Sequence, residues 1–293
     1  MLLLTGATGL VGSNLLGRLL AEGTQVRCLV RDPRRLGTQR VRVQIALGDL
    51  TDPPSFRNAL RGVDTVVHLA AAIRDQPQGS IEELDGIATW RMVEAAERQG
   101  VERFLFFSAL GASTHHRTRC LRAKALAEQA VAEADLSSVI FAPSIVYAPG
   151  DPWLALLERL ALLPVMPMSG WGRASFQPIW AEDVADCIVA TLRDGDGQRR
   201  RRYELAGPET LSHSEIIRTV LRALRRNRPL LHVPTPLVSR SLRLLERAMG
   251  ARAFATWDEA ELMEVSMVTP RGSADVEALG VAPQRMSAVL EAA

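Results

Sequence analysis

The sequence contains a single lysine, Lys124, among 35 lysine and arginine residues. A coding preference for arginine accounts for the other 34 basic residues, but it does not account for the exception. Lysine carries a compact ammonium on a flexible stem, whereas arginine carries a planar guanidinium, so the two are not interchangeable where geometry matters. Lys124 is therefore a candidate for a contact that requires an ammonium group.

A glycine-rich segment near the start of the sequence has the spacing of a phosphate-binding loop. Residues 5–12 read TGATGLVG, follow an apolar run and precede a helical pattern. Glycines permit a tight turn and a close approach of backbone amides to a diphosphate, and the start of a helix adds unpaired N–H groups and a positive dipole end. We expect a dinucleotide to be held here by Gly6, Thr8, Gly9, Leu10, Val11 and Gly12.

The elements around these residues alternate between short apolar strands and helical stretches. This alternation is typical of parallel βαβ units, and runs such as VVHLA and FLFF suit strands that are covered on both faces. The sequence predicts an α/β protein with a Rossmann-type doubly wound parallel sheet and a smaller C-terminal cap domain. Strands are expected at 1–5, 25–30, 41–47, 63–69, 103–108 and 137–142, and helices at 9–22, 53–61, 80–98 and 119–134.

Several residues mark the ends of helices. An aspartate directly before a proline is typical of a helix start, and Ser with Glu three residues later has capping-box spacing. Glycine is favoured where a helix stops. The predicted starts are at Asp52-Pro53, Ser80 with Glu83, Asp151-Pro152 and Ser212 with Glu215, and the predicted stops are at Gly62 and Gly100.

The pattern changes after residue 150, where prolines and tryptophans become denser. We expect residues 1–150 to form the dinucleotide-binding domain and 176–202 to return to it. The cap is then made of 151–175 and 203–293, and it serves a substrate or a partner. Residues 194–202 read DGDGQRRRR, which predicts an exposed loop with a solvated arginine run; contact with an anionic lipid or partner surface is the alternative.

The composition excludes several classes of protein. A net charge of +2 over 293 residues is too small to indicate a nucleic-acid partner. Cys28, Cys120 and Cys187 are widely spaced and form no zinc-binding pattern, so we expect no metal and a reducing compartment. No apolar stretch is long enough for a transmembrane segment. We expect a cytoplasmic location, with attachment to the inner face of a membrane left open.

Several motifs together resemble one family. They are TGATGLVGSNL at the start, GDL at 48–50, HLAA at 68–71, APSIVYAPGD at 142–151 and FQPIWAEDVA at 176–185. The chain resembles atypical or extended short-chain dehydrogenases of the NAD-dependent epimerase/dehydratase type. It is most similar to the branch that resembles the nucleotide-binding accessory subunit of respiratory complex I. The resemblance covers almost the whole chain but is loose beyond residue 230.

In this family the end of the second strand distinguishes NADP(H) from NAD(H). An acidic residue there accepts from the ribose 2′-hydroxyl of NAD, whereas an arginine offers donors to the 2′-phosphate of NADP. The register of the family places Arg31 at this position, with Arg34 or Arg35 in support. We therefore predict NADP(H), while Asp32 leaves NAD(H) open.

The resemblance also implies further cofactor contacts. Asp49 and Leu50 are expected beside the adenine, and Ala70 and Ala71 beside the ribose. The expected neighbours of the nicotinamide are Pro143, Ser144 and Ile145. For the alanines and Ile145 simple core packing is the alternative.

The catalytic residues depart from the family pattern. Active relatives use a serine and a Tyr-x-x-x-Lys motif, in which the tyrosine transfers the proton. The resemblance places Ser108 and Lys124 at the serine and lysine positions, but Cys120 stands where the tyrosine belongs. A thiol is shorter than a phenol and fails the need for hydrogen-bond reach, although we expect Lys124 to lower its pKa. Substitutes left open are His115, His116 and Tyr147; a small buried residue is the alternative for Cys120.

Three functions remain open at this point. The first is an NADP(H)-holding accessory or assembly subunit with weak or no hydride transfer, working in a membrane-associated protein complex. The second is an NADPH-dependent reductase or nucleotide-sugar epimerase that uses Ser108 and a substitute acid. The third is a regulator that distinguishes NADP+ from NADPH. In the first case an apolar helical face at 237–249 serves docking, with core packing as its alternative.

Overall fold

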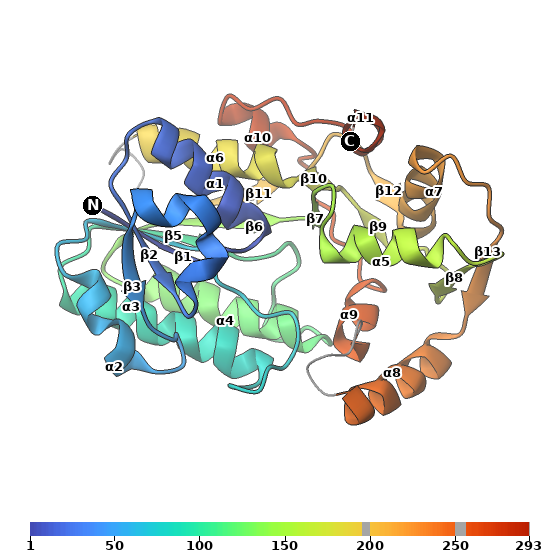
Figure 1. Ribbon diagram of the computed structural model, residues 1–293, viewed down its shortest axis with the longest axis horizontal. Coiled ribbons are helices and arrows are strands. Elements are labelled where there is room, and N and C mark those ends of the chain that lie inside the picture. Colours follow the sequence, from blue (N-terminus) through green and yellow to red (C-terminus); the bar gives the residue numbers. More distant parts are fainter. Residues whose placement is uncertain (195–199, 250–255, 293) are drawn as a thin grey trace.

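A seven-stranded sheet forms the centre of the computed structural model, which describes residues 1–194, 200–249 and 256–292. The strand order is β11-β6-β5-β4-β1-β2-β3, and all neighbouring strands are parallel. Helices cover both faces (Figure 1). The predicted Rossmann-type doubly wound sheet is confirmed. Its strands are β1 (Leu2–Thr5), β2 (Val26–Val30), β3 (Gln44–Leu47), β4 (Thr65–His68), β5 (Arg103–Phe107), β6 (Ser137–Pro143) and β11 (Arg201–Leu205).

The apolar side chains of β1 show that this inner strand of the sheet is covered on both faces. Alternate residues of a strand point to opposite faces. Leu2 and Leu4 pack into the core on one face, and Leu3 packs into the core on the other. All four residues of the strand are buried, so β1 must be covered on both sides.

Two groups of helices provide that cover (Figure 1). On one face lie α1 (Leu10–Ala21) and α6 (Ala181–Arg193), together with the shorter α10 (Ala274–Ala278). On the opposite face lie α2 (Pro53–Phe56), α3 (Ala88–Arg98) and α4 (Arg119–Glu133). A π-helical segment, Glu82–Ile87, leads into α3, and 3₁₀ segments occupy Pro33–Arg42 and Arg57–Leu60.

A second unit lies beyond the carboxyl end of the sheet (right in Figure 1). Tyr147 and Phe176 are fully buried at its centre, which gives it a hydrophobic core of its own. Its strands are β7 (Val146–Tyr147), β8 (Met166–Ser169), β9 (Ser175–Phe176), β10 (Ile179–Trp180), β12 (Leu211–Ser212) and β13 (Leu230–Val233). Its helices are α5 (Pro152–Leu160), α7 (His213–Ala223), α8 (Thr235–Met249), α9 (Trp257–Leu262) and α11 (Met286–Ala292).

The expectation for residues 194–202 was wrong at its carboxyl end. Arg201 and Arg202 belong to β11, whose backbone pairs in parallel with β6. The expected start of the cap at residue 203 therefore falls inside a strand of the main sheet. Backbone pairing with β6 overrides the charge of these side chains, which remain exposed. Residues 195–199 of the predicted loop lie outside the described part of the chain.

The predicted helix ends are correct with one exception. The Asp151 carboxylate accepts from Trp153 N at 2.7 Å and Leu154 N at 2.8 Å. The capping boxes at Ser80 with Glu83 and at Ser212 with Glu215 are formed, and Gly62 and Gly100 have positive φ where helical segments stop. Within the described chain Asp52 does not cap α2, because its ψ of 89° turns it away from the usual capping conformation.

Candidate functional site

The glycine loop between β1 and α1 is the most constrained part of the site. Gly6 has a φ of +72°, and a Cβ atom there would lie 2.6 Å from Ala70 N. A Cβ atom on Gly12 would lie 2.1 Å from the carbonyl oxygen of Gly6. Real Cβ atoms do not approach other atoms so closely, so the backbone course of the loop requires glycine at both positions.

The start of α1 presents backbone donors without a side-chain cap. Gly9 stands at the N-cap, and none of the described side chains accepts from the first turn, which also contains no acidic residue. The first amides of a helix have no intrahelical partner, and the dipole favours an anion there. Leu10 and Val11 therefore offer N–H groups to a diphosphate, which fits the predicted dinucleotide.

A chain of three polar side chains ties this loop to the neighbouring strand. Thr5 Oγ1 accepts from Ala70 N at 3.3 Å and forms a hydrogen bond with His68 Nδ1 at 2.9 Å. His68 Nε2 forms a further hydrogen bond with Thr89 Oγ1 at 3.2 Å. Because His68 is fully buried, its pKa is lowered to about 3 and the ring stays neutral. Thr89 was not predicted from the sequence, and Thr5 and His68 were named only within motifs.

Of the charged residues after β2, Arg31 is exposed at the strand end, whereas Asp32 and Arg34 form an ion pair. Arg31 is exposed and donates to Gln76 Oε1 at 3.3 Å. Asp32 instead accepts from Arg34 Nε at 3.0 Å and Nη2 at 3.1 Å, and this hydrogen bonding lowers the pKa of the carboxyl. This ion pair therefore engages Asp32, the acid that left NAD(H) open, and Arg34, one of the two arginines expected to support Arg31. Arg35 is exposed nearby.

The other expected adenine and ribose neighbours lie at strand ends on the same edge of the sheet. Asp49 follows β3 and accepts from the amide and the hydroxyl of Thr51, both at 2.9 Å. Leu50 is half-buried and packs against the core. Ala70 is half-buried and Ala71 is exposed, so core packing does not account for Ala71.

Lys124 lies on α4 with its ammonium in a nearly closed environment. Its side chain is 5% exposed, and Nζ donates to Phe107 O at 2.8 Å and to Asp85 Oδ1 at 3.1 Å. The ammonium also lies 5.1 Å from the centre of the Phe106 ring. These contacts use two of its three N–H groups. Asp85 was not predicted from the sequence. Its signal was an acid on the apolar side of the helix expected at 80–98, four residues after Ile81.

Cys120 is one turn before Lys124 and is 7% exposed, packed with Ile81 and Ala123. Burial raises the pKa of its thiol to about 11, and the nearby Asp85 carboxylate adds to that rise. Lys124 does act to lower this pKa, as expected, but the net shift is upward. Desolvation of the thiolate outweighs the attraction of the ammonium.

Ser108 follows β5 and is 3% exposed. Its Oγ has no hydrogen-bond partner among the described residues, which suits a hydroxyl that meets a ligand. Tyr147, one of the substitute acids, is fully buried in the cap core, and burial raises the pKa of its hydroxyl. His116 interacts with Thr118 Oγ1 at 3.0 Å, and His115 is exposed.

The expected neighbours of the nicotinamide have structural partners in this arrangement. Ser144 Oγ donates to Met267 O at 2.7 Å and accepts from Gln177 N at 3.0 Å. Pro143 ends β6 and is buried, while Ile145 packs against the cap core. Core packing, the alternative for Ile145, agrees with this position.

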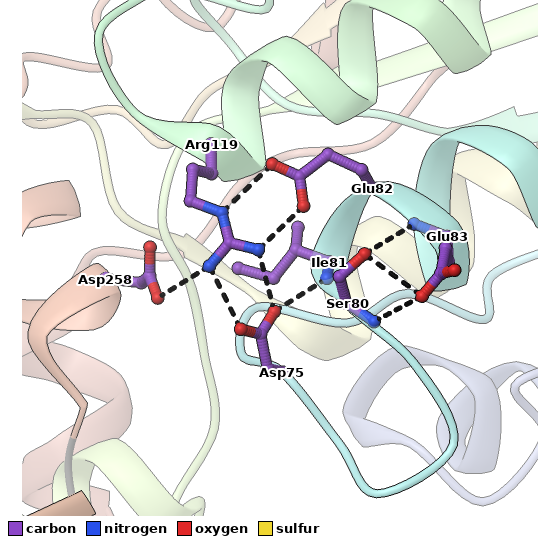
Figure 2. A network of polar contacts seen from close by, with 7 residues as sticks. All are labelled: Asp75, Ser80, Ile81, Glu82, Glu83, Arg119 and Asp258. Carbon is purple, nitrogen blue, oxygen red and sulfur yellow. Dashed lines mark hydrogen bonds and ion pairs between the residues drawn. The ribbon is translucent and has the colours of Figure 1, made fainter.

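A polar network surrounds Arg119, the residue directly before Cys120 in the sequence (Figure 2). Arg119 forms paired hydrogen bonds with Asp75 at 2.9 and 3.0 Å and with Glu82 at 2.7 and 2.9 Å. It also lies 3.6 Å from Asp258 at the start of α9. The network joins the loop after β4, the start of α4 and the cap.

Across residues 1–194, 200–249 and 256–292, no group of three or more His, Cys, Asp or Glu side chains is arranged to hold a metal ion. None of the helices in the same ranges has the length and hydropathy needed to cross a bilayer.

The parallel sheet, the glycine turn and the uncapped α1 define a dinucleotide-binding protein of the Rossmann class. The sequence pattern of an NAD(P)H-binding family matches residues 6–195, and the chain belongs to this family. The resemblance to short-chain dehydrogenases of the epimerase/dehydratase type is confirmed.

The relatives of this chain are named for different functions. The chain is 30% identical to the Arabidopsis thaliana mitochondrial NADH dehydrogenase [ubiquinone] 1 alpha subcomplex subunit 9, over 79% of the chain and 60% of that protein. It is 32% identical to a ceramide reductase from Caulobacter vibrioides, over 65% of the chain and 60% of the relative. Identity to the photosystem II assembly factor Ycf39 of Cyanophora paradoxa is 26%, over 87% and 76% respectively. The first two relatives are thus substantially longer than the matched region.

Solved structures confirm the fold. A nucleoside-diphosphate-sugar epimerase from Staphylococcus aureus superimposes with a TM-score of 0.80 over 99% of both chains, at 18% sequence identity. At this identity the likeness concerns the arrangement of the chain and not its chemistry.

Proposed function

We propose that this protein holds NADP(H) as an accessory or assembly subunit and performs weak or no hydride transfer. One contrast supports the proposal. The glycine loop, the start of α1 and Lys124 supply groups for a dinucleotide, whereas the position of the proton donor is held by a buried thiol. Cys120 is 7% exposed and burial raises its pKa to about 11, so it is a poor proton donor near neutral pH.

The start of α1 would hold the diphosphate, Lys124 the ribose on the nicotinamide side and Arg31 the 2′-phosphate. Bound NADPH supplies a hydride donor in its nicotinamide ring. NADP(H) is favoured over NAD(H) because Asp32 is engaged by Arg34, while Arg31 is exposed at the strand end. The cofactor then stabilises the fold, by about 2.7 kcal/mol at a concentration about 100 times its dissociation constant.

The test is a comparison of the native protein with Cys120→Tyr. NADPH oxidation is measured with panels of carbonyl compounds and nucleotide sugars, and NADPH binding is measured separately. We expect the native protein to bind NADPH without turnover and Cys120→Tyr to gain activity. Cys187→Ala, which removes another buried thiol, is the control and should change neither quantity. Robust turnover by the native protein would exclude the accessory role.

A working reductase is the second candidate, because Ser108 Oγ is buried and unpartnered within the described structure and one relative is named a ceramide reductase. In this case the native protein reduces a carbonyl substrate and Ser108→Ala abolishes that turnover. A nucleotide-sugar epimerase would show itself by product formation without net NADPH consumption.

The partner of an accessory subunit would be a membrane-associated protein complex, as the name of the Arabidopsis relative suggests. Helix α8 offers a surface for it, since Leu237 and Leu244 are 56% and 64% exposed and Arg240 and Arg243 are exposed beside them. We expect the tagged protein to sediment with membranes from its source cells. Leu237→Ser with Leu244→Ser should release it, and Leu126→Ser, at an exposed leucine of α4, should not.

A further inference from the structure

The Lys124–Asp85 pair is the most deeply buried ion pair that the structure shows among its described residues. The two side chains are 5% and 0% exposed, and Nζ lies 3.1 Å from Oδ1. The other carboxylate oxygen, Oδ2, is shielded from solvent and has no partner in the described chain. An arrangement with one oxygen left unsatisfied is costly, so packing alone does not explain why an aspartate stands there.

The surroundings of Lys124 show what the aspartate does. Phe107 O accepts from the ammonium and Phe106 lies below it, but both are uncharged. Burial disfavours a charged amine, and an opposite charge within about 4–6 Å counters this effect. Among the titratable groups around Lys124, Asp85 comes from the π-helical segment, His68 from β4 and Cys120 from α4. Of these three, only Asp85 is a carboxyl group; burial raises its pKa, and the Lys124 ammonium 3.1 Å away opposes that rise and favours the charged pair.

We propose that Asp85 is a positioning residue that keeps Lys124 charged and aims its third N–H at the cofactor ribose. The inference rests on the proposed binding of NADP(H), but it concerns a residue that does not itself touch the cofactor. Asp85→Asn keeps the size and hydrogen bonding of the side chain and removes its charge. The uncompensated ammonium then loses its proton at lower pH, and the grip on the ribose weakens as the pH rises.

The experiment compares NADPH with 2′,5′-ADP, which carries the adenosine half and the 2′-phosphate but no nicotinamide ribose. The dissociation constants of both ligands are measured from about pH 6 to about pH 9, a range chosen around neutrality where an uncompensated buried lysine titrates. His68 and Cys120 do not titrate there, because burial sets their pKa values near 3 and 11. Any titration of the 2′-phosphate affects both ligands and cancels in their ratio.

In the native protein we expect the ratio of the two affinities to be nearly constant across this range. In Asp85→Asn it should fall about tenfold or more toward alkaline pH, the size expected for a lost charged hydrogen bond. The fall should disappear in Asp85→Asn with Lys124→Met, because the aspartate acts through the lysine. Asp183→Asn, at a buried carboxylate on α6 across the sheet, is the matched control and should behave as the native protein.

A second measurement needs no variant. Lys124 is the sole lysine of the sequence, so protein grown with labelled lysine gives one side-chain signal in an NMR titration. We expect the ammonium form throughout the same pH range. A neutral amine near pH 7, or a constant ratio in folded Asp85→Asn, would overturn the role of Asp85. Failure of the native protein to bind NADPH at all would instead overturn the proposed function.

Discussion

Lys124 and Cys120 lie one turn apart on α4, yet their surroundings give them opposite properties. Lys124 has a carboxylate and a carbonyl oxygen as partners, so its charge is supported where it is buried. Cys120 has mainly apolar neighbours, and the loss of water raises its pKa. The chemistry of a residue in this site therefore depends on what surrounds it, and residue type alone is a poor guide.

Arg31→Ala tests the choice of cofactor. The guanidinium is exposed at the strand end and available to a 2′-phosphate, so its loss should weaken NADPH binding about 10- to 100-fold and leave NADH binding nearly unchanged. Titration calorimetry with both cofactors measures the two effects. Arg40→Ala, at an exposed arginine of the same segment, should affect neither cofactor. An equal loss for NADH would show that Arg31 does not recognise the phosphate.

At the scale of elements, β1 and α1 form one unit whose turn presents the helix amides. The turn depends on contacts between backbone atoms: Gly9 N donates to Gly6 O at 2.9 Å, and Gly12 packs against the same carbonyl oxygen. The hydrogen bond between Thr5 and His68 connects this turn to β4. The proposed diphosphate site therefore depends on two strands and a helix together.

Two glycines of α1 provide a matched pair of variants. A Cβ atom on Gly12 would meet the Gly6 carbonyl oxygen at 2.1 Å, so Gly12→Ala should destabilise the fold by about 2 kcal/mol or more and abolish NADPH binding. At Gly17 the nearest atom is a side-chain nitrogen of Gln39 at 3.5 Å. Gly17→Ala should therefore stabilise the helix by about 1 kcal/mol and keep binding. Denaturant unfolding and cofactor titration measure both outcomes; equal behaviour of the two variants would contradict this assignment.

At the scale of the whole molecule, ion pairs connect the two units beside the site. Arg119 reaches Asp258, and Arg74 pairs with Glu259 at 2.6 Å, so two successive acids at the start of α9 face the Rossmann unit. Arg117 Nη2 also donates to Glu264 O at 3.2 Å. These contacts hold the cap against the start of α4, and Figure 2 shows the one between Arg119 and Asp258.

Each unit also contains a buried neutral histidine, and both histidines make the fold less stable at acid pH. The pKa of His68 is lowered to about 3 and that of His213 to about 4, in both cases by burial. Both lie below the unfolded value of about 6.5, so the unfolded state binds protons more strongly and stability falls as the pH drops from about 7 to about 5. Each histidine should cost about 2 kcal/mol over this interval.

Urea unfolding at the two pH values measures this loss. His68→Gln should be less stable at neutral pH but should lose about 2 kcal/mol less than the native protein on acidification. His115→Gln, at an exposed histidine, should keep the native pH dependence of stability. An unchanged loss in His68→Gln would show that His68 is not neutral in the folded protein.

Local patterns were sufficient for most of the first half of the chain. Apolar runs and glycine spacing act through neighbouring residues, so the strands, the turn at Gly6 and the start of α5 at Asp151 could be placed from the sequence. β11 could not, because Arg201 and Arg202 form a strand only through backbone pairing with β6. The capping role of Asp52 failed for a similar reason: the path of the chain between β3 and α2, and not the residue type, sets its conformation.

The sequence by itself determined that this protein has a doubly wound sheet with a glycine turn after its first strand, and that its one lysine stands four residues after Cys120. Only the tertiary structure decided that Asp85 faces the Lys124 ammonium from 39 residues away. It also decided that the thiol is too deeply buried to be acidified. The physical reason is that charge states depend on desolvation and on partners brought together by folding, neither of which local sequence patterns contain.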